Sequence, residues 1–315
     1  MILTVTLNPC VDLTLFVDTL KPFDTNRISR KEVDAGGKGI NLSRVAVELG
    51  AESVATGFIG GPVGDQVLAV MRDQGVADAM VRTRAETRMN FSVEDGTENP
   101  PTTFNAKGGP FDSSEWTALV NKVTELSRES KWVAIGGSLP LGVPADAYKT
   151  LVEVAKSQGA KVLLDADGEP LKAGLVAAPD MIKPNLPEAS RLLGRPLQTR
   201  EEAVEAVREI WQMLKSAGAE QPIALLSMGS KGALAFDGDA VLFAEPIEIE
   251  EKSTIGSGDS LLGGLLAGLV GGDSLEEALK QGSAAGAATA MTDGTQIARR
   301  GEVQRLIKLA KVQRI

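Results

Sequence analysis

The chain of 315 residues contains no histidine. This absence excludes a Ser-His-Asp triad, a zinc ion held by imidazole, and every mechanism in which histidine is the general base. Proton transfer must then rely on a carboxylate, a lysine, the tyrosine or the single cysteine. Any metal ion is expected to be a hard cation on oxygen ligands, such as Mg²⁺.

Cysteine, aromatic residues and positive charge are also scarce. The one cysteine, Cys10, rules out an internal disulfide bond, and the one tyrosine and three tryptophans leave few platforms on which nucleic-acid bases could stack. The net charge of −9 argues against a nucleic-acid surface. An anionic substrate would have to be drawn by local positive charge instead.

Targeting and membrane signals are absent as well. No uninterrupted apolar run reaches membrane-spanning length. The first residues, MILTVTLNP, lack the basic and apolar regions of a signal peptide. We therefore expect a cytoplasmic protein that binds neither nucleic acid nor a membrane.

What the sequence does contain is an alternation of short apolar segments with amphipathic ones. Strands are expected at 1–7, 54–59, 132–135, 161–165, 181–183 and 223–227, and helices near 42–49, 65–74, 144–158, 168–177, from 187, and near 200–217. Such alternation predicts an α/β fold, with an open and largely parallel sheet covered by helices on both faces. Ligands bind such sheets at the carboxyl ends of the strands.

Four segments depart from this pattern because they alternate polar and apolar residues, which is typical of strands with one face solvated or facing a ligand. They are residues 11–18, 28–34, 89–95 and 101–107. The last two are joined by a polar turn at 96–100. We expect a small β-sheet lid, inserted at about 11–34 and 89–107 into a single domain that spans residues 1–315.

The stretch STIGSGDS at 253–260 ends an extended run and opens an apolar, small-residue helix. Asp259 should lie in the first turn, and Gly256 and Gly258 let backbone N–H groups crowd together, which suits an anion. A carboxylate beside such donors is what phosphoryl transfer needs: a base for a hydroxyl proton and a dipole for the phosphate. Asp is also a common helix-start residue, so the motif alone leaves catalysis and capping equally open.

The sequence GGKG at 36–39 precedes another helix. It fits neither the Walker pattern nor the dinucleotide fingerprint, which a Rossmann oxidoreductase would need. It can be a point where the backbone approaches a polyhydroxy ligand, with Asn41 hydrogen-bonding and Lys38 meeting a phosphate. The alternative is a flexible turn before a helix.

Two arginines, Arg27 and Arg88, lie next to expected lid strands. Together with Lys38 they could give this acidic protein one cationic pocket, and Asp12 could bind sugar hydroxyls. Taken separately, each of these side chains is more ordinarily a solvated surface residue.

Polar clusters follow several expected strands, at 136–138, 165, 183–185 and 228–230. Within one of them, Asn185 and Glu188 have the spacing of a capping box, with Pro187 near the helix start. The other reading uses Glu188 to organise Mg²⁺-bound water near nucleotide phosphates. The cap is the favoured reading of these residues alone.

Seven motifs in order give the chain a resemblance to the PfkB (ribokinase-like) family of sugar kinases, in particular its phosphofructokinase and tagatose-6-phosphate kinase branch. They are TLNPCVD at the start, AGGKGIN at 35–41, TRMN at 87–90, GGSLPLGVP at 136–144, IKPNLPE at 182–188, SMGSKGAL at 227–234 and TIGSGDS at 254–260. The usual Gly-Ala-Gly-Asp is Gly-Ser-Gly-Asp here, and Thr102-Thr103 stands where Thr-Glu is common.

The resemblance implies a ribokinase-like three-layer sandwich in which Asp259 is the base and the N–H groups of Gly256, Ser257 and Gly258 form the anion hole. It implies that Asp12, Gly36, Gly37, Asn41 and Ser138 hold the sugar, that Arg27, Lys38 and Arg88 hold its phosphate, and that Lys183, Asn185, Glu188, Ser227, Gly229, Ser230, Gly232 and Thr254 face ATP and its phosphates, with Mg²⁺ meeting Glu188 through water.

The residues and the resemblance together predict an ATP- and Mg²⁺-dependent kinase that phosphorylates a primary hydroxyl of a ketohexose monophosphate. Fructose 1-phosphate is the first choice because AGGKGIN, with Lys38, resembles the fructose-1-phosphate and tagatose-6-phosphate branch; tagatose 6-phosphate and fructose 6-phosphate are alternatives. A catalytically silent sugar-phosphate sensor on a kinase fold is the alternative of another class. We also expect a homodimer formed through the lid sheets, whose outer faces would otherwise expose Leu, Phe and Val.

Overall fold

A run of five residues without a charge, ILTVT, forms strand β1 (Ile2–Thr6), and all five residues are buried. Parallel strands covered on both faces need such continuous sequence. In the computed structural model, which describes residues 1–97 and 101–315, β1 pairs in parallel with β4 (Ser53–Ile59) and β9 (Trp132–Gly136). It therefore lies inside the central sheet.

This central sheet has eleven strands in the order β15-β14-β13-β12-β11-β10-β9-β1-β4-β5, with β6 also paired to β4. Beyond β1, β4 and β9 the strands are β5 (Ala77–Asp78), β6 (Val81–Arg82), β10 (Lys161–Asp165), β11 (Met181–Ile182), β12 (Ile223–Ser227), β13 (Ala233–Phe236), β14 (Val241–Ala244) and β15 (Val312–Arg314). The six predicted strands are confirmed to within one residue at each end. The antiparallel strands β13 to β15 were not predicted.

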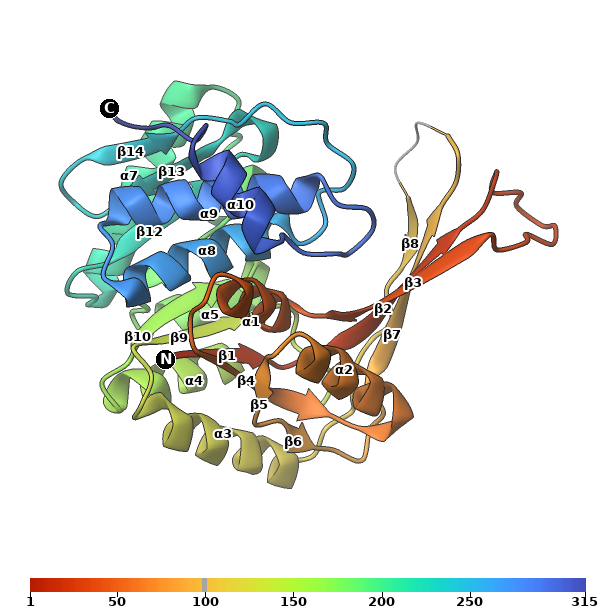
Figure 1. Ribbon diagram of the computed structural model, residues 1–315. Helices are drawn as coiled ribbons and strands as arrows, with labels where there is room; N and C mark the ends of the chain where they lie inside the picture. Colours follow the sequence, from red (N-terminus) through yellow and green to blue (C-terminus); the bar gives the residue numbers. More distant parts are fainter. Residues whose placement is uncertain (98–100) are drawn as a thin grey trace.

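Helices cover both faces of this sheet, as the alternation predicted (Figure 1). On one face lie α1 (Lys38–Glu48), α8 (Ser257–Gly271) and α9 (Leu275–Ala290), with α10 (Arg300–Ile307) outside α9; on the other lie α3 (Ser113–Ser127), α4 (Ala147–Ser157), α5 (Gly168–Leu175), α6 (Leu186–Leu193) and α7 (Arg200–Ala217), and α2 (Gly61–Asp73) packs beside β4 and the lid. Neighbours in β1 divide between the two cores, with Ile2 on one side and Leu3 on the other. The ribokinase-like three-layer sandwich is confirmed.

Helix α1 begins at Lys38, four residues before the predicted start. The glycines look like a turn, yet Gly37 adopts φ 119° at the N-cap and the helix follows at once. Glycine tolerates this backbone conformation, which other residues rarely adopt. Lys38 consequently lies in the first turn of a helix, at the carboxyl edge of the sheet.

Small residues let α8 and α9 pack closely. A Cβ atom at Gly264 would lie 3.0 Å from the Cβ of Ala285, and one at Gly282 would lie 2.5 Å from the carbonyl oxygen of Leu261. This contact anchors the apolar body of α8. None of the described helices is long and apolar enough to cross a membrane.

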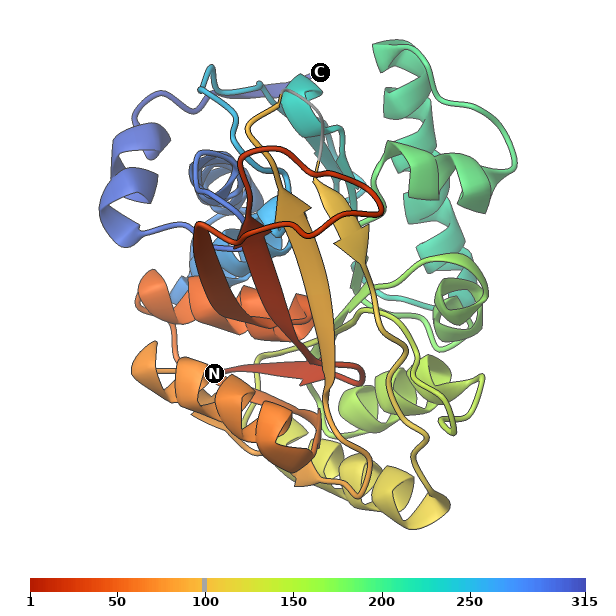
Figure 2. The same ribbon diagram turned by 90° about the vertical axis from the view of Figure 1, so that its right-hand side faces the viewer.

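The second sheet stands away from the main body and has four strands in the order β3-β2-β7-β8 (Figures 1 and 2). They are β2 (Cys10–Phe16), β3 (Arg30–Gly36), β7 (Arg88–Glu94) and β8 (Thr102–Phe104). All four predicted lid strands are confirmed, although β8 is shorter than predicted. Residues 98–100 of the predicted turn lie outside the described part of the chain. Asp12 faces Asn90 across the parallel pair β2–β7, so both side chains lie on one face of the lid.

Candidate active site

Two cavities meet at the carboxyl edge of the central sheet. The first, of about 550 Å³, lies between the lid and the main body, and the second, of about 840 Å³, extends along the N-terminus of α8. Three side chains border both cavities: Lys38, Glu188 and Asp259. A group bound in one cavity can therefore reach a group bound in the other beside these three side chains.

Residues predicted to hold the sugar phosphate border the first cavity, and residues predicted to face ATP border the second. Asp12, Gly37, Lys38, Asn41, Arg88, Ser138 and Gly256 border the first; Lys38, Lys183, Asn185, Glu188, Ser227, Gly229, Ser230, Gly232, Thr254, Ser257 and Gly258 border the second. Arg27 and Gly36 are the two exceptions. Arg27 lies in the exposed loop between β2 and β3, and this chain alone does not bring it to the cavity.

Asp259 lies in the first turn of α8, as predicted. The N-cap is Gly256 with φ 75°, a left-handed conformation that favours glycine. Among the described residues no acceptor is found for the N–H groups of Gly256 and Gly258, whereas that of Ser257 donates to Thr254 O over 3.3 Å. The helix start therefore presents N–H donors beside a carboxylate.

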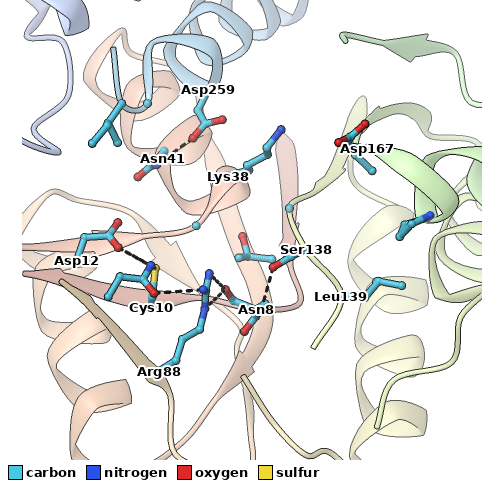
Figure 3. A pocket seen from close by; sticks show the side chains of 18 of the residues that line it. Asn8, Cys10, Asp12, Lys38, Asn41, Arg88, Ser138, Leu139, Asp167 and Asp259 are labelled. Carbon is cyan, nitrogen blue, oxygen red and sulfur yellow. Dashed lines mark hydrogen bonds between the residues drawn. The ribbon is translucent and has the colours of Figure 1, made fainter. Parts of the chain in front are cut away.

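The Asp259 carboxylate is positioned by Asn41, whose Nδ2 donates to Oδ2 over 2.9 Å (Figure 3). Burial raises the pKa of Asp259 to about 6, Lys38 and the Asn41 hydrogen bond oppose that rise, and the nearby Asp165 adds to it. At neutral pH the group is mostly ionised, yet it is a better base than an ordinary aspartate.

Asp165, at the end of β10, is a buried carboxylate between two lysines. Its Oδ2 lies 3.0 Å from Lys38 Nζ and its Oδ1 lies 3.6 Å from Lys183 Nζ. Burial favours the neutral acid, but the two ammonium groups outweigh it and hold the pKa of Asp165 below its usual range. Burial likewise opposes the charge of Lys38, while Asp165, Asp259 and Glu188 raise the Lys38 pKa above its usual value. Both cations are thus fixed beside the second cavity, and Lys38 borders the first as well.

The sequence pointed to Asp165 only as a polar residue after a strand and gave it no role. Its partners lie 127 positions before it and 18 positions after it in the chain, so local spacing carries no signal of this contact. Lys38 was predicted to meet the substrate phosphate together with Arg88. The structure places Lys38 beside Asp259, and Arg88 lies on the other side of the first cavity (Figure 3).

On the lid side, a small network holds Asp12. Its Oδ1 accepts from Cys10 Sγ over 3.1 Å and from Asn90 Nδ2 over 2.9 Å. Burial and the neighbouring Asp12 raise the pKa of the Cys10 thiol, so it remains a donor. Gly36 lies behind this network, because a Cβ atom there would be 2.0 Å from Asp12 Oδ2. The roles of Cys10 and Asn90 were not predicted.

Arg88 is held by backbone oxygens as well as by Asn90. Its Nε and Nη2 donate to Asn8 O, and its Nη1 donates to Ala106 O over 2.9 Å and to Asn90 Oδ1 over 3.2 Å. Ser138, which also borders the first cavity, accepts from Asn8 Nδ2 over 3.0 Å. A guanidinium oriented in this way offers a fixed positive charge to an anionic group.

The predicted capping box at the start of α6 is confirmed. Asn185 Oδ1 accepts from Glu188 N over 2.9 Å, and Glu188 Oε2 accepts from Asn185 N over 2.8 Å. No hydrogen bond to Glu188 Oε1 occurs among the described residues. Capping therefore uses one oxygen of Glu188 and leaves the other beside both cavities.

A protein-only metal cage is not found in the described part of the chain, where no three Asp, Glu, Cys or His side chains gather closely enough. The single free carboxylate oxygen of Glu188 suits a hard cation that keeps its water molecules. Such a cation would take its remaining ligands from nucleotide phosphates. The residues present thus fit Mg²⁺ bound together with a nucleotide.

Comparison with known proteins agrees with this geometry. The family model for pfkB family carbohydrate kinases matches residues 5–300 of this chain. The chain is 34% identical over 315 residues to 1-phosphofructokinase from Bacillus subtilis (strain 168), covering 100% of both chains. It is 32% identical over 303 residues, 94% of each chain, to tagatose-6-phosphate kinase from Staphylococcus epidermidis (strain ATCC 12228).

Among solved structures, phosphofructokinase-2 from Escherichia coli in complex with substrates and products superposes with a TM-score of 0.91 at 29% identity, covering 98% of each chain. The agreement extends over both sheets and all layers of the fold, and it rejects the oxidoreductase alternative. The chain belongs to the pfkB family of carbohydrate kinases, enzymes that transfer a phosphoryl group to an alcohol group of a sugar.

Proposed function

We propose that this protein is an ATP- and Mg²⁺-dependent kinase that phosphorylates a primary hydroxyl of a ketohexose monophosphate, with fructose 1-phosphate as the first choice. One observation carries the proposal: Asp259 borders both cavities, so one carboxylate can serve an acceptor in the first and a nucleotide in the second. The sugar kinase activity of the family requires this arrangement of base, acceptor and donor.

In the proposed reaction the sugar hydroxyl gives its proton to Asp259 Oδ1, because Oδ2 is occupied by Asn41. The hydroxyl oxygen then forms a bond to the γ-phosphorus of ATP as the bond from that phosphorus to the leaving oxygen of ADP breaks. Mg²⁺, when bound, neutralises charge on the nucleotide phosphates. Lys38 and the N–H groups of Gly256 and Gly258 stabilise the charge on the transferred group.

The first cavity suits a sugar that already carries a phosphate. Arg88 supplies a fixed cation on the side away from Asp259, and Asp12 supplies a carboxylate for sugar hydroxyls between them (Figure 3). The names of the relatives, 1-phosphofructokinase and tagatose-6-phosphate kinase, support a ketohexose monophosphate. Phosphate bound at Arg88 would hold the far end of the sugar and aim its free primary hydroxyl at Asp259.

Steady-state rates of ADP formation with fructose 1-phosphate, tagatose 6-phosphate and fructose 6-phosphate test the substrate. We expect the highest kcat/KM with fructose 1-phosphate. Equal activity on unphosphorylated ribose or adenosine would refute the phosphate pocket. The silent sensor predicts binding of a sugar phosphate without ADP formation, and any turnover that depends on the sugar phosphate excludes it.

We also propose that two chains associate through the lid. The row Val33, Leu13, Phe91 and Phe104 crosses all four lid strands in register. Side chains alternate along a strand, so this row faces away from the Asp12 and Asn90 side. Phe104 is 59% exposed and Val33 is 43% exposed in the single chain. A partner lid would remove this apolar row from water.

A further inference from the structure

The side chain that positions Asp259 is itself oriented by a second one. Asn41 donates through Nδ2 to Asp259, and its Oδ1 accepts from Arg44 Nη1 over 3.1 Å. The two ends of an amide have nearly the same shape, so shape alone does not decide which end faces Asp259. A guanidinium can only donate, and Arg44 therefore takes the oxygen end and leaves Nδ2 for the carboxylate.

Arg44 is well suited to this task because it is fixed from every side. It is 2% exposed and ranks among the largest fully buried side chains. Its Nη2 pairs with Asp34 Oδ1 over 3.0 Å, its Nη1 also donates to Ala35 O over 2.9 Å, and its Nε donates to Gln74 Oε1 over 2.5 Å. With this degree of burial, neither the sugar nor the nucleotide contacts it.

The same contacts connect the root of the lid to the catalytic carboxylate. Asp34 and Ala35 belong to lid strand β3, while Arg44 and Asn41 lie one turn apart on α1. The other oxygen of Asp34 accepts from Thr295 Oγ1 over 2.9 Å, which adds the segment after α9. Three separate parts of the chain thus converge on the orientation of one amide.

We propose that Arg44 is a positioning residue for catalysis, which sets the orientation of Asn41 and through it aims Asp259 at the acceptor hydroxyl. The inference rests on the proposed role of Asp259 in the kinase reaction. Without Arg44 the amide loses the donor that holds its oxygen, and its side chain can turn away from Asp259. Asp259 would then lose its only side-chain donor among the described residues and bind its proton more tightly.

Other charged groups near Asp259 also influence its pKa, which the pH profile of activity would report. Lys38 from α1 and Lys183 from the segment after β11 favour the ionised carboxylate, and Asp165 from β10 opposes it. An Arg44→Met change leaves all three in place. It also leaves Asp34 without its cationic partner, so its direct electrostatic effect must be separated from the effect through Asn41.

A double-mutant cycle on the full chain makes this separation. We expect Arg44→Met to lower kcat about a hundredfold, as misplacement of a reacting group does. In the pH profile of kcat/KM, the acid limb, which reports the Asp259 pKa of about 6, should move to higher pH. In an Asn41→Leu background the same change should have no further effect on kcat or on the limb, because the residue it acts through is gone. Gln74→Leu is the matched control, since it removes a contact of Arg44 but not the one to Asn41, and it should leave both readouts unchanged.

Two results would overturn the inference. One is an Arg44→Met variant whose kcat and acid limb of the pH profile equal those of the wild type. The other is an equal loss of kcat from Arg44→Met in the wild-type and the Asn41→Leu backgrounds. If Arg44→Met does not fold, Arg44→Lys keeps a cation beside Asp34, but its single ammonium cannot reproduce the fork to Asn41, and it should show the same shift. A wild-type limb in Arg44→Lys overturns the inference as well. A wild-type protein that phosphorylates no sugar phosphate would instead refute the proposed function.

Discussion

Asp259 is the residue whose removal tests the proposed chemistry most directly. Asparagine keeps the size of the side chain but cannot take the hydroxyl proton, so Asp259→Asn should lower kcat by about 10²–10⁴-fold. The affinity for ATP should change little, because that nucleotide is expected in the second cavity. Steady-state kinetics with a separate nucleotide titration measure both quantities. A variant with nearly the wild-type kcat would show that Asp259 only begins the helix.

The raised pKa of Asp259 also has a consequence for stability. Burial lifts the pKa from 3.8 to about 6 in the folded protein. The folded protein therefore holds a proton that the unfolded chain releases between these values, and stability falls as the pH rises through this range. Asp259→Asn removes the buried charge, so at pH 8 the variant should be more stable than the wild type. Thermal unfolding at several pH values should show this advantage disappearing at acid pH.

The control for that stability measurement is Asp167→Asn, which removes an exposed carboxylate near the first cavity. Its side chain pairs with Arg191, and that bond lowers the pKa of Asp167. The pKa of Asp167 is therefore shifted in the opposite direction to that of Asp259, and Asp167→Asn should not stabilise the protein at pH 8. A wild-type stability profile in Asp259→Asn would contradict the assigned pKa.

Whether a site residue could be predicted depends on how far apart in the sequence its contacts lie. Ser227, Gly229 and Thr254 belong to short sequence motifs, and the sequence identified them among the residues that border the second cavity. Asp165 and Arg44 act through contacts across 127 and 10 positions that join separate elements. No local pattern reports such contacts, because burial and geometry arise only after the elements pack.

At the scale of single elements, the N-terminus of α8 carries the site. Both ends of this helix have a glycine in the left-handed conformation, Gly256 with φ 75° and Gly272 with φ 100°. An alanine at either position would be strained by about 1–2 kcal/mol. A Cβ atom at Gly256 meets nothing closer than 3.9 Å, and one at Gly272 meets nothing within 4 Å, so strain and not collision is the expected cost.

This symmetry gives a matched pair of variants. Gly256→Ala and Gly272→Ala should lower the thermal unfolding midpoint by similar amounts. Only Gly256→Ala should also lower kcat, by about tenfold or more, because it shifts the N–H groups proposed to hold the transferred phosphoryl group. Equal kcat in the two variants would show that the helix start contributes no anion hole.

The sequence predicted some helices and strands better than others, and the difference has a physical cause. Strands buried on both faces, such as β1 and β10, have interiors without a charged residue, which the sequence marks clearly. Strands β13 to β15 are only three or four residues long and lie at one end of the sheet, where no repeating pattern marks them. Helix α1 started early because Gly37 begins a helix where glycine usually ends one.

At the scale of the whole molecule, the lid is a sheet with two different faces. One face carries Asp12 and Asn90 into the first cavity, and the other carries the apolar row of Val33, Leu13, Phe91 and Phe104. The alternation of residues predicted a two-faced sheet, but the parallel pairing of β2 with β7 could not be predicted, since it depends on how the lid joins the body. A lid that must stay ordered over the cavity gains support from a partner on its outer face.

We therefore expect the wild-type protein to be a dimer at micromolar concentration, by light scattering after size exclusion. Phe104→Glu places a charge in the apolar row of the proposed interface, where desolvation without a partner is costly, and should give a monomer. Val176→Glu is the control, because Val176 is an apolar residue of similar exposure, 67%, on the main body. It should leave the dimer intact. A monomeric wild type, or a dimer that survives Phe104→Glu but not Val176→Glu, would contradict association through the lid, and the apolar row would then need another partner.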